Sequence, residues 1–310
     1  MKQMDDYVRM LQNRQTIESH LDKGLVNCIN AEIAAGTIST VSEGVQWLKK
    51  TYLYQRFTKN PHAYGISVLD LQMDPSGHMV LLNKVTEAAE KLNRARLIRY
   101  NKQTEQVYST DMGRIASNYY IDVETMSYFM ANLRPTTRDA MLLYHLAQAS
   151  EFKQLDARKE EYEELKVLVA ESSIVEVDKA LFNEAHTKVL VLFEAYLKQR
   201  VVKTFSLISD MAYVVNNAAR LLRAMFEIAL KKNFAGLLKS TLQWCQILDK
   251  RLVPGRHILR HFTKDASVGK LTNQNAKTSN FGYLKDEIVY RIEQFDISME
   301  ALYEKKLDEA

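Results

Sequence analysis

The stretch 206–233, SLISDMAYVVNNAARLLRAMFEIALKKN, constrains the fold of this 310-residue chain more than any other part. It contains no Gly or Pro and is rich in Ala, Leu and Met, so it predicts one long helix over Ser206–Asn233. Apolar residues cover most of the circumference of that helix. We therefore expect the helix to be largely buried.

One face of this helix is polar. Asn216, Asn217, Arg220, Arg223 and Glu227 recur at spacings of three and four residues, which stacks them along one side. An unpaired Arg in a dry core is costly, so this stripe meets other polar groups or lines a wet channel. The residues leave two interpretations open. In the first, Arg223 and Glu227 form an ion pair with each other, and the two Asn residues occupy surface positions. In the second, the stripe lines the channel.

Composition and charge narrow the class of protein. The length predicts two or more domains. A hydrophobic content of 46% is enough to form hydrophobic cores, and the low numbers of Gly (10) and Pro (4) favour a mainly helical fold. The formal net charge is only +4, but residues 200–262 contain 11 Lys or Arg against 3 acidic residues. This basic block includes the polar stripe and suits a polyanionic partner.

The cysteines and the hydropathy indicate where the protein works. Cys28 and Cys245 lie far apart without metal-type spacing, which is typical of free thiols in a reducing compartment. The sequence opens without a signal peptide and has no apolar run long enough to span a membrane. It therefore predicts an intracellular protein of the nucleus or cytoplasm with no membrane partner.

The first part of the chain predicts a winged-helix domain. Helices over about 20–35, 41–58 and 79–96 are followed by a strand, a turn and a strand over 97–109, which is the element order of a winged helix. Gly36 is expected to end the first helix, and Thr40 or Ser42 to cap the second. Thr110 or Asp111 then caps a short helix that leads out. From residue 122 onward, helices with short links predict a bundle, at about 123–133, 137–149, 158–170, 179–200, 206–233 and 234–251.

Four glutamates in the predicted helix over 158–170 are interpreted as a solvated face rather than an acid–base pair: Glu160, Glu161, Glu163 and Glu164.

The predicted domains are therefore a preceding tail or linker, a winged helix, a helical bundle and an incomplete terminal part, over 1–19, 20–121, 122–252 and 253–310. The last part comprises a polar loop over 263–282 and a final helical pair.

Sequence motifs for catalysis are missing. The sequence has no Gly-x-x-x-x-Gly-Lys-Ser/Thr phosphate loop and no Asp-Glu-x-His run for magnesium. His257 and His261 are four residues apart but lack a third flanking ligand, so we interpret them as part of a cationic surface. We predict no catalytic or metal-binding residue, and expect the chain to be inactive alone.

Several stretches nevertheless resemble one family. Residues 30–37, 47–54 and 60–66 are similar to the linker and winged helix of Ski-two-like superfamily-two (DExH-box) helicases, and TDMGRIASNYYI over 110–121 resembles the exit of that winged helix. Further stretches resemble the helical bundle called the Sec-sixty-three domain, at 151–152, 158–161, 205–210, 217–220, 226–230, 249–251 and 259–262.

Two branches of the family are similar to this chain. One is the ribosome-rescue helicase of the activating signal cointegrator complex, and the other is the large spliceosomal RNA helicase. Asn217-Ala-Ala-Arg220 and the lead Phe205–Asp210 resemble the first branch more. Asn216, where the family has Gln, and the loop 263–282 depart from both.

The resemblance implies that the long helix is a ratchet helix beneath a translocating single strand of RNA or DNA. The resemblance implies that Asn217 and Arg220 contact the strand, and implies the same with less weight for Asn216 and Arg223. It implies a C-terminal accessory part of an ATP-dependent helicase, with motor domains before residue 1 that hold ATP and Mg²⁺, and with partners in a cointegrator-type or spliceosomal complex. The chain is then a fragment or a truncated gene product. The alternative function is a non-catalytic scaffold whose basic face docks an acidic protein.

Overall fold

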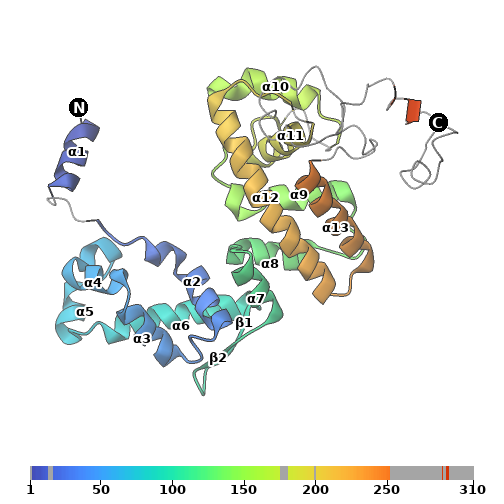
Figure 1. Cartoon of the computed structure of the whole chain (residues 1–310). Coiled ribbons are helices and arrows are strands. Elements are labelled where there is room, and N and C mark those ends of the chain that lie inside the picture. Colours follow the sequence, from blue (N-terminus) through green and yellow to red (C-terminus); the bar gives the residue numbers. More distant parts are fainter. Residues whose placement is uncertain are drawn as a thin grey trace, which may run out of the picture. The chain divides into compact units, whose positions relative to one another are not determined.

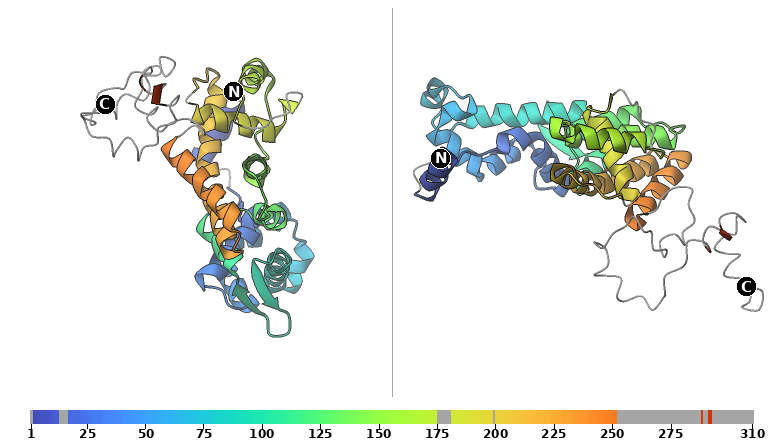
Figure 2. Two further views of the ribbon diagram at one scale, coloured as in Figure 1. Left: turned by 90° about the vertical axis from the view of Figure 1, so that its right-hand side faces the viewer. Right: turned by 90° about the horizontal axis from the view of Figure 1, so that it is seen from above.

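The computed structural model describes residues 2–12, 17–174, 181–198 and 200–251, together with 288, 291 and 292. These form two compact units, Met1–Ala131 and Asn132–Ala310, each of which we describe by itself (Figure 1 and Figure 2). The predicted loop over 263–282 and the pair His257 and His261 lie outside the described residues, as does most of the predicted terminal helical pair.

The first unit is built from helices and one β-hairpin, in the order predicted for a winged helix. Its helices are α1 (Lys2–Leu11), α2 (Leu21–Ala35), α3 (Val41–Lys49), α4 (Tyr52–Lys59), the 3-10 helix η1 (Pro61–Tyr64), α5 (Val68–Met73), α6 (His78–Arg94), α7 (Asp111–Asn118) and α8 (Val123–Asn132). Strands β1 (Ile98–Asn101) and β2 (Gln106–Ser109) pair antiparallel with Ile98 opposite Ser109. Helix α6 packs on α2 and α3, which forms the core beneath the hairpin.

The expected helix over 41–58 is in fact two helices. The chain leaves the helical region at Thr51 (φ −88°, ψ 159°), whose hydroxyl donates to Leu48 O at 2.7 Å. A β-branched residue that bonds its local backbone in this way competes with the helix, so α3 ends and α4 begins here. Two predicted caps are confirmed: Gly36 ends α2 in the left-handed region (φ 80°), and the Thr40 side chain accepts from Glu43 N at the start of α3.

Helix α7 lies unusually close to the chain that enters the hairpin. A Cβ built on Gly113 would come within 2.1 Å of Leu97 O, so only Gly fits there. The Asn30 amide of α2 donates to Gly113 O at 3.0 Å, and the Thr110 side chain accepts from Gly113 N, which confirms the predicted cap. Ile115 is consequently buried, with 2% of its surface exposed.

The second unit is a helical bundle. Its elements are α9 (Asp139–Ala147), the 3-10 helices η2 (Ser150–Phe152) and η3 (Lys159–Glu161), α10 (Tyr162–Ala170), α11 (Ala185–Leu197), α12 (Phe205–Lys231) and α13 (Ala235–Lys250). The 27-residue α12 is the long helix predicted from the sequence, and it packs along α13 and α11 (Figure 1 and Figure 2). Its buried face is apolar, as predicted, and includes Leu221, Leu222 and Met225. The mainly α fold, a winged helix followed by a helical bundle, is thus confirmed.

The predicted helix over 179–200 begins later than expected. Residues 181–184 form turns, and α11 starts at Ala185 after Glu184, whose backbone is extended (φ −78°, ψ 145°). The predicted start at 158 is likewise a 3-10 turn before α10. Short 3-10 turns commonly lead directly into an α-helix, and sequence patterns do not mark the residue at which the helix proper begins.

Glu18 ties the segment before α2 to the end of α4. Its carboxylate accepts from Arg56 NH2 at 2.7 Å, Asn60 Nδ2 at 2.9 Å and the Tyr64 hydroxyl at 2.8 Å. The hydrogen bonds from Arg56, Asn60 and Tyr64 lower the pKa of Glu18 to about 2. A charge-assisted network thus anchors part of the predicted tail to the winged helix.

We expect Ile115→Ala to lower the free energy of unfolding by about 2–5 kcal/mol, because the truncation leaves a cavity between α7 and α2. A denaturant melt of the whole chain measures this change. Asn118→Ala, at an exposed position of the same helix, is the control and should stay within about 0.5 kcal/mol. An Ile115→Ala variant as stable as the control would mean that α7 does not pack as described.

Glu18 predicts a pH dependence. Because its folded-state pKa is lowered from 4.5 to about 2, its network stabilises the fold above about pH 4.5 and loses that effect as pH falls toward 2. We therefore expect the stability difference between parent and Glu18→Gln to be largest near pH 6 and to shrink on acidification. Urea melts from pH 6 to pH 2.5 measure it. A difference that stays constant or grows on acidification would contradict this assignment.

Candidate nucleic-acid interface

The predicted polar residues do form one side of α12, and we call Asn216, Asn217, Arg220, Arg223 and Glu227 the α12 stripe. The structure divides the stripe into an inner and an outer part. Asn217 is 8% exposed; its Nδ2 donates to Tyr213 O at 2.8 Å, and its Oδ1 accepts from Arg220 Nε at 3.0 Å and NH2 at 2.5 Å. The amide thereby holds the guanidinium in one orientation.

Arg220 also faces a carboxylate from another element. Its NH2 lies 3.9 Å from Glu151 Oε1 on η2, and the side chains are 29% and 7% exposed respectively. The Tyr213 hydroxyl donates to Glu151 O at 3.0 Å and accepts from Gln154 Nε2 at 3.1 Å. The inner part of the stripe therefore meets buried polar groups, which offsets the cost of burying an Arg.

Arg223 and Asn216 form the outer, exposed part. Arg223 NH2 lies 3.1 Å and 3.2 Å from the two carboxylate oxygens of Asp249 on α13, so the structure pairs it across two helices, whereas the ion-pair interpretation named Glu227. Both side chains of this pair are about half exposed, at 52% and 50%. An ion pair so exposed is weak, so a competing phosphate can replace Asp249 at little cost.

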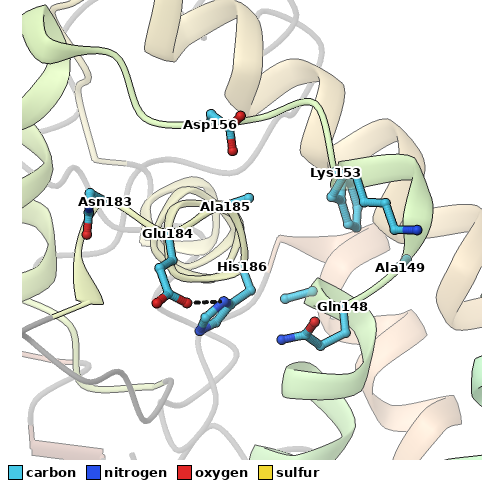
Figure 3. A pocket seen from close by; sticks show the side chains of 10 residues that line it. Gln148, Ala149, Lys153, Asp156, Asn183, Glu184, Ala185 and His186 are labelled. Carbon is cyan, nitrogen blue, oxygen red and sulfur yellow. Dashed lines mark ion pairs between the residues drawn. The ribbon is translucent and has the colours of Figure 1, made fainter.

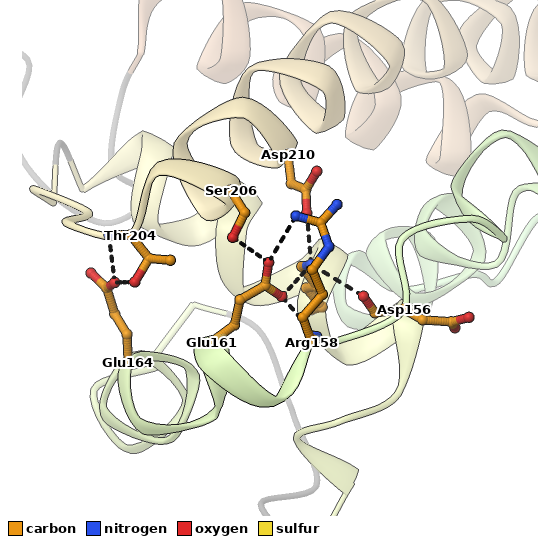
Figure 4. Close-up of polar contacts among 8 residues, drawn as sticks. Asp156, Arg158, Glu161, Glu164, Thr204, Ser206 and Asp210 are labelled. Carbon is orange, nitrogen blue, oxygen red and sulfur yellow. Dashed lines mark hydrogen bonds and ion pairs between the residues drawn. The ribbon is translucent and has the colours of Figure 1, made fainter. Parts of the chain in front are cut away.

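A buried ion triad sets the direction in which α12 begins. Lys188 of α11, with no exposed side-chain surface, places its Nζ 2.7 Å from Glu161 Oε2 and 2.7 Å from Asp210 Oδ2. Ser206 donates to Glu161 Oε1 at 2.6 Å, and Figure 4 shows the Glu161 carboxylate between Ser206 and Arg158. The first turn of α12 is thereby joined to η3 and α11.

The acidic stretch corrects the sequence interpretation. Glu161 is fully buried, and Glu164 accepts hydrogen bonds from the backbone N–H groups of Lys203 and Thr204 at the entry to α12. The prediction of a solvated face is therefore wrong for these two glutamates. Glu160 and Glu163 are exposed, as expected. Burial alone would raise the pKa of Glu161. The hydrogen bonds from Arg158 N–H, Lys188 and Ser206 outweigh that effect and hold the pKa below its ordinary value.

Sequence reasoning missed Lys188, Glu151 and Tyr213. A signal existed for Lys188, because it directly precedes the apolar run VLVLF over 189–193, and a Lys beside so apolar a run indicates a buried partner. Tyr213 lies four residues before Asn217, on the same side of α12. Nothing local in the sequence indicates that Glu151 meets Arg220.

A pocket of about 400 Å³ lies elsewhere in the second unit. It is lined by Ala147, Gln148, Ala149, Phe152, Lys153, Asp156, Asn183, Glu184, Ala185 and His186. Figure 3 shows the Glu184 carboxylate facing the His186 ring, with Oε2 and Nδ1 3.1 Å apart. The pocket contains no residue of the α12 stripe.

The sequence carries no phosphate-loop motif, and among the residues that the structure describes there is no group of three His, Cys, Asp or Glu that could hold a metal ion. Among the described helices, none is long and apolar enough to cross a membrane.

We expect Lys188→Met to lower the free energy of unfolding by about 3–5 kcal/mol, because it leaves Glu161 and Asp210 without their shared cation. Chemical denaturation followed by circular dichroism measures this loss. Adding Glu161→Gln should recover part of it by removing one uncompensated charge, and Lys166→Met at an exposed ion pair is the control. Equal melts for Lys188→Met and Lys166→Met would show that the triad contributes nothing.

Comparison with known families agrees with the domain types. Residues 109–304 match the model of the Sec63 Brl domain, and residues 18–87 match a Winged Helix-turn-helix domain. The chain is similar to Activating signal cointegrator 1 complex subunit 3 of Gallus gallus, with 36% identity over 96% of this chain and 14% of that protein. The same subunit of Homo sapiens is 37% identical over 84% of this chain and 12% of that protein.

The U5 small nuclear ribonucleoprotein 200 kDa helicase of Homo sapiens is also similar, with 35% identity over 96% of this chain and 13% of the helicase. The chain therefore spans only 12–14% of the length of these relatives. Both branches suggested by the sequence motifs are confirmed as relatives. On its fold, its domain matches and its relatives, the chain belongs to the Sec63 Brl domain family, within the Ski-two-like DExH-box helicases.

Proposed function

We propose that this chain guides single-stranded RNA or DNA along the α12 stripe, as the accessory region of an ATP-dependent helicase. The observation that carries the proposal is the arrangement of the stripe itself. Arg220 is oriented by Asn217 and Glu151, while Arg223 and Asn216 are exposed beside it on the same helix. Oriented guanidinium and amide groups along one line suit a chain of phosphates and bases.

The division of the stripe gives its two parts different tasks. Arg220 is already held in place, so little side-chain entropy is lost when it meets a strand. Arg223 exchanges Asp249 for a phosphate, so its contact adds to the salt dependence of binding. Asn216 contributes an uncharged hydrogen bond. A strand held this way stays able to slide, because each contact is weak.

The proposal extends to the remaining parts of such a helicase. The winged helix buttresses motor domains of the same protein, and ATP and Mg²⁺ bind to those motor domains. The complex is of the cointegrator or spliceosomal type, since the similar proteins are named as members of such assemblies. A place in the nucleus or the cytoplasm accords with both.

A salt series on a fluorescent single-stranded oligonucleotide tests the proposal. Single strands lose affinity with a slope of about 0.7 in log K against log salt for each neutralised phosphate. We expect Arg223→Ala to weaken binding and to lower this slope by about 0.7. Asn216→Ala should weaken binding with the slope unchanged, because an amide neutralises no phosphate.

Lys59→Ala is the matched control, since it removes one positive charge from an exposed site on α4 in the other unit. It should change neither affinity nor slope by a comparable amount. Equal effects of Lys59→Ala and Arg223→Ala would indicate attraction by net charge alone. A folded Arg223→Ala variant with parental affinity and slope would favour the scaffold that docks an acidic protein.

A further inference from the structure

One exposed line runs the whole length of α12. Its members recur at helical spacing and are Phe205, Ile208, Ser209, Ala212, Asn216, Arg223 and Leu230. The line therefore continues the outer part of the α12 stripe toward the start of the helix. Residues on one helix face three, four or seven apart lie above one another, so these side chains share one surface.

The start of this line is apolar. Phe205 is 82% exposed, and Ile208, one turn further, is 41% exposed. Leu207 between them is fully buried, and Ser206 bonds Glu161 of the ion triad, so the turn that carries Phe205 is rigidly held. The ring of Phe205 and the side chain of Ile208 therefore offer an exposed apolar surface on a fixed turn, which a flat ligand can cover.

The neighbouring residues indicate what the ring contacts. Ser209 and Ala212 are small, so the surface between Phe205 and Asn216 is low and open. Arg223 lies 18 residues further, about 27 Å along the helix at a rise of 1.5 Å per residue. An aromatic ring and a guanidinium on one line, in a segment with surplus Lys and Arg, match a strand that offers both flat bases and phosphates.

We propose that Phe205 is a stacking platform for a base of the single strand that α12 guides. The inference rests on the proposed function but adds a residue and a contact type to it. Stacking on an aromatic side chain tolerates any base, because every base has a flat face. The platform therefore grips the strand without reading its sequence, while Arg223 holds the backbone further along.

The test uses the whole chain and unstructured oligo(dT) and oligo(U), long enough to span the line. Phe205→Ala should weaken binding by roughly fivefold or more with the salt slope unchanged, because stacking neutralises no phosphate. Phe205→Leu keeps an apolar side chain but loses the ring, and should fail equally. Leu242→Ala, an exposed apolar truncation on α13, is the control and should bind as the parent does.

Phe205→Trp gives a direct reading of the contact. The parent has two Trp residues, so the difference in emission between variant and parent isolates the new indole. The variant should keep parental affinity, and its added emission should be quenched by the oligonucleotide but not by an abasic strand of equal length.

Each of the other possible outcomes contradicts one specific claim. If Phe205→Leu binds like the parent, or the indole is not quenched, the stacking inference fails; if Arg223→Ala still lowers the slope, the proposed function stands without it. If no oligonucleotide binds the parent, both fail, and the exposed Phe205 and Ile208 then belong to a protein contact.

Discussion

The arrangement of the second unit depends on the fully buried Lys188 and its two carboxylates. Removing three charges from water is costly, and the fold recovers that cost only when Glu161 and Asp210 both reach the same Nζ. This requirement brings η3, α11 and the second turn of α12 to one point. Glu164 accepts from the backbone N–H groups of Lys203 and Thr204, which fastens the chain that enters the long helix to α10.

With its start held, α12 presents one face to the core and one to solvent. The buried face is apolar and packs on α13 and α11, which makes the helix a rigid support. The boundary between the two faces holds Asn217 and Arg220, whose polar groups bond one another and face Glu151. The outer residues then form an open line from Phe205 to Arg223. Binding groups carried on a rigid, well-packed helix keep their relative positions, as the proposed strand contacts need.

The first unit uses tight backbone packing in place of buried charge. Gly113 lets α7 approach Leu97 O, and Asn30 bonds the carbonyl of that same Gly, so the exit helix and the hairpin are joined to α2. At the other end, Glu18 connects the entering chain to Arg56, Asn60 and Tyr64. Both ends of the winged helix are thus tied to its core.

The sequence by itself determined the mainly α class, the hairpin, several caps, the long helix and the family. These depend on local periodicity, on residues with special backbone preferences, and on motifs that stand in order along the chain. It also placed the α12 stripe on one face, because helical spacing is local. The tertiary structure alone decided that Glu161 is buried, that Arg220 meets Glu151, that Arg223 meets Asp249 and that Phe205 is exposed. Each of these depends on which distant element packs against the residue, and spacing along one helix carries no information about that.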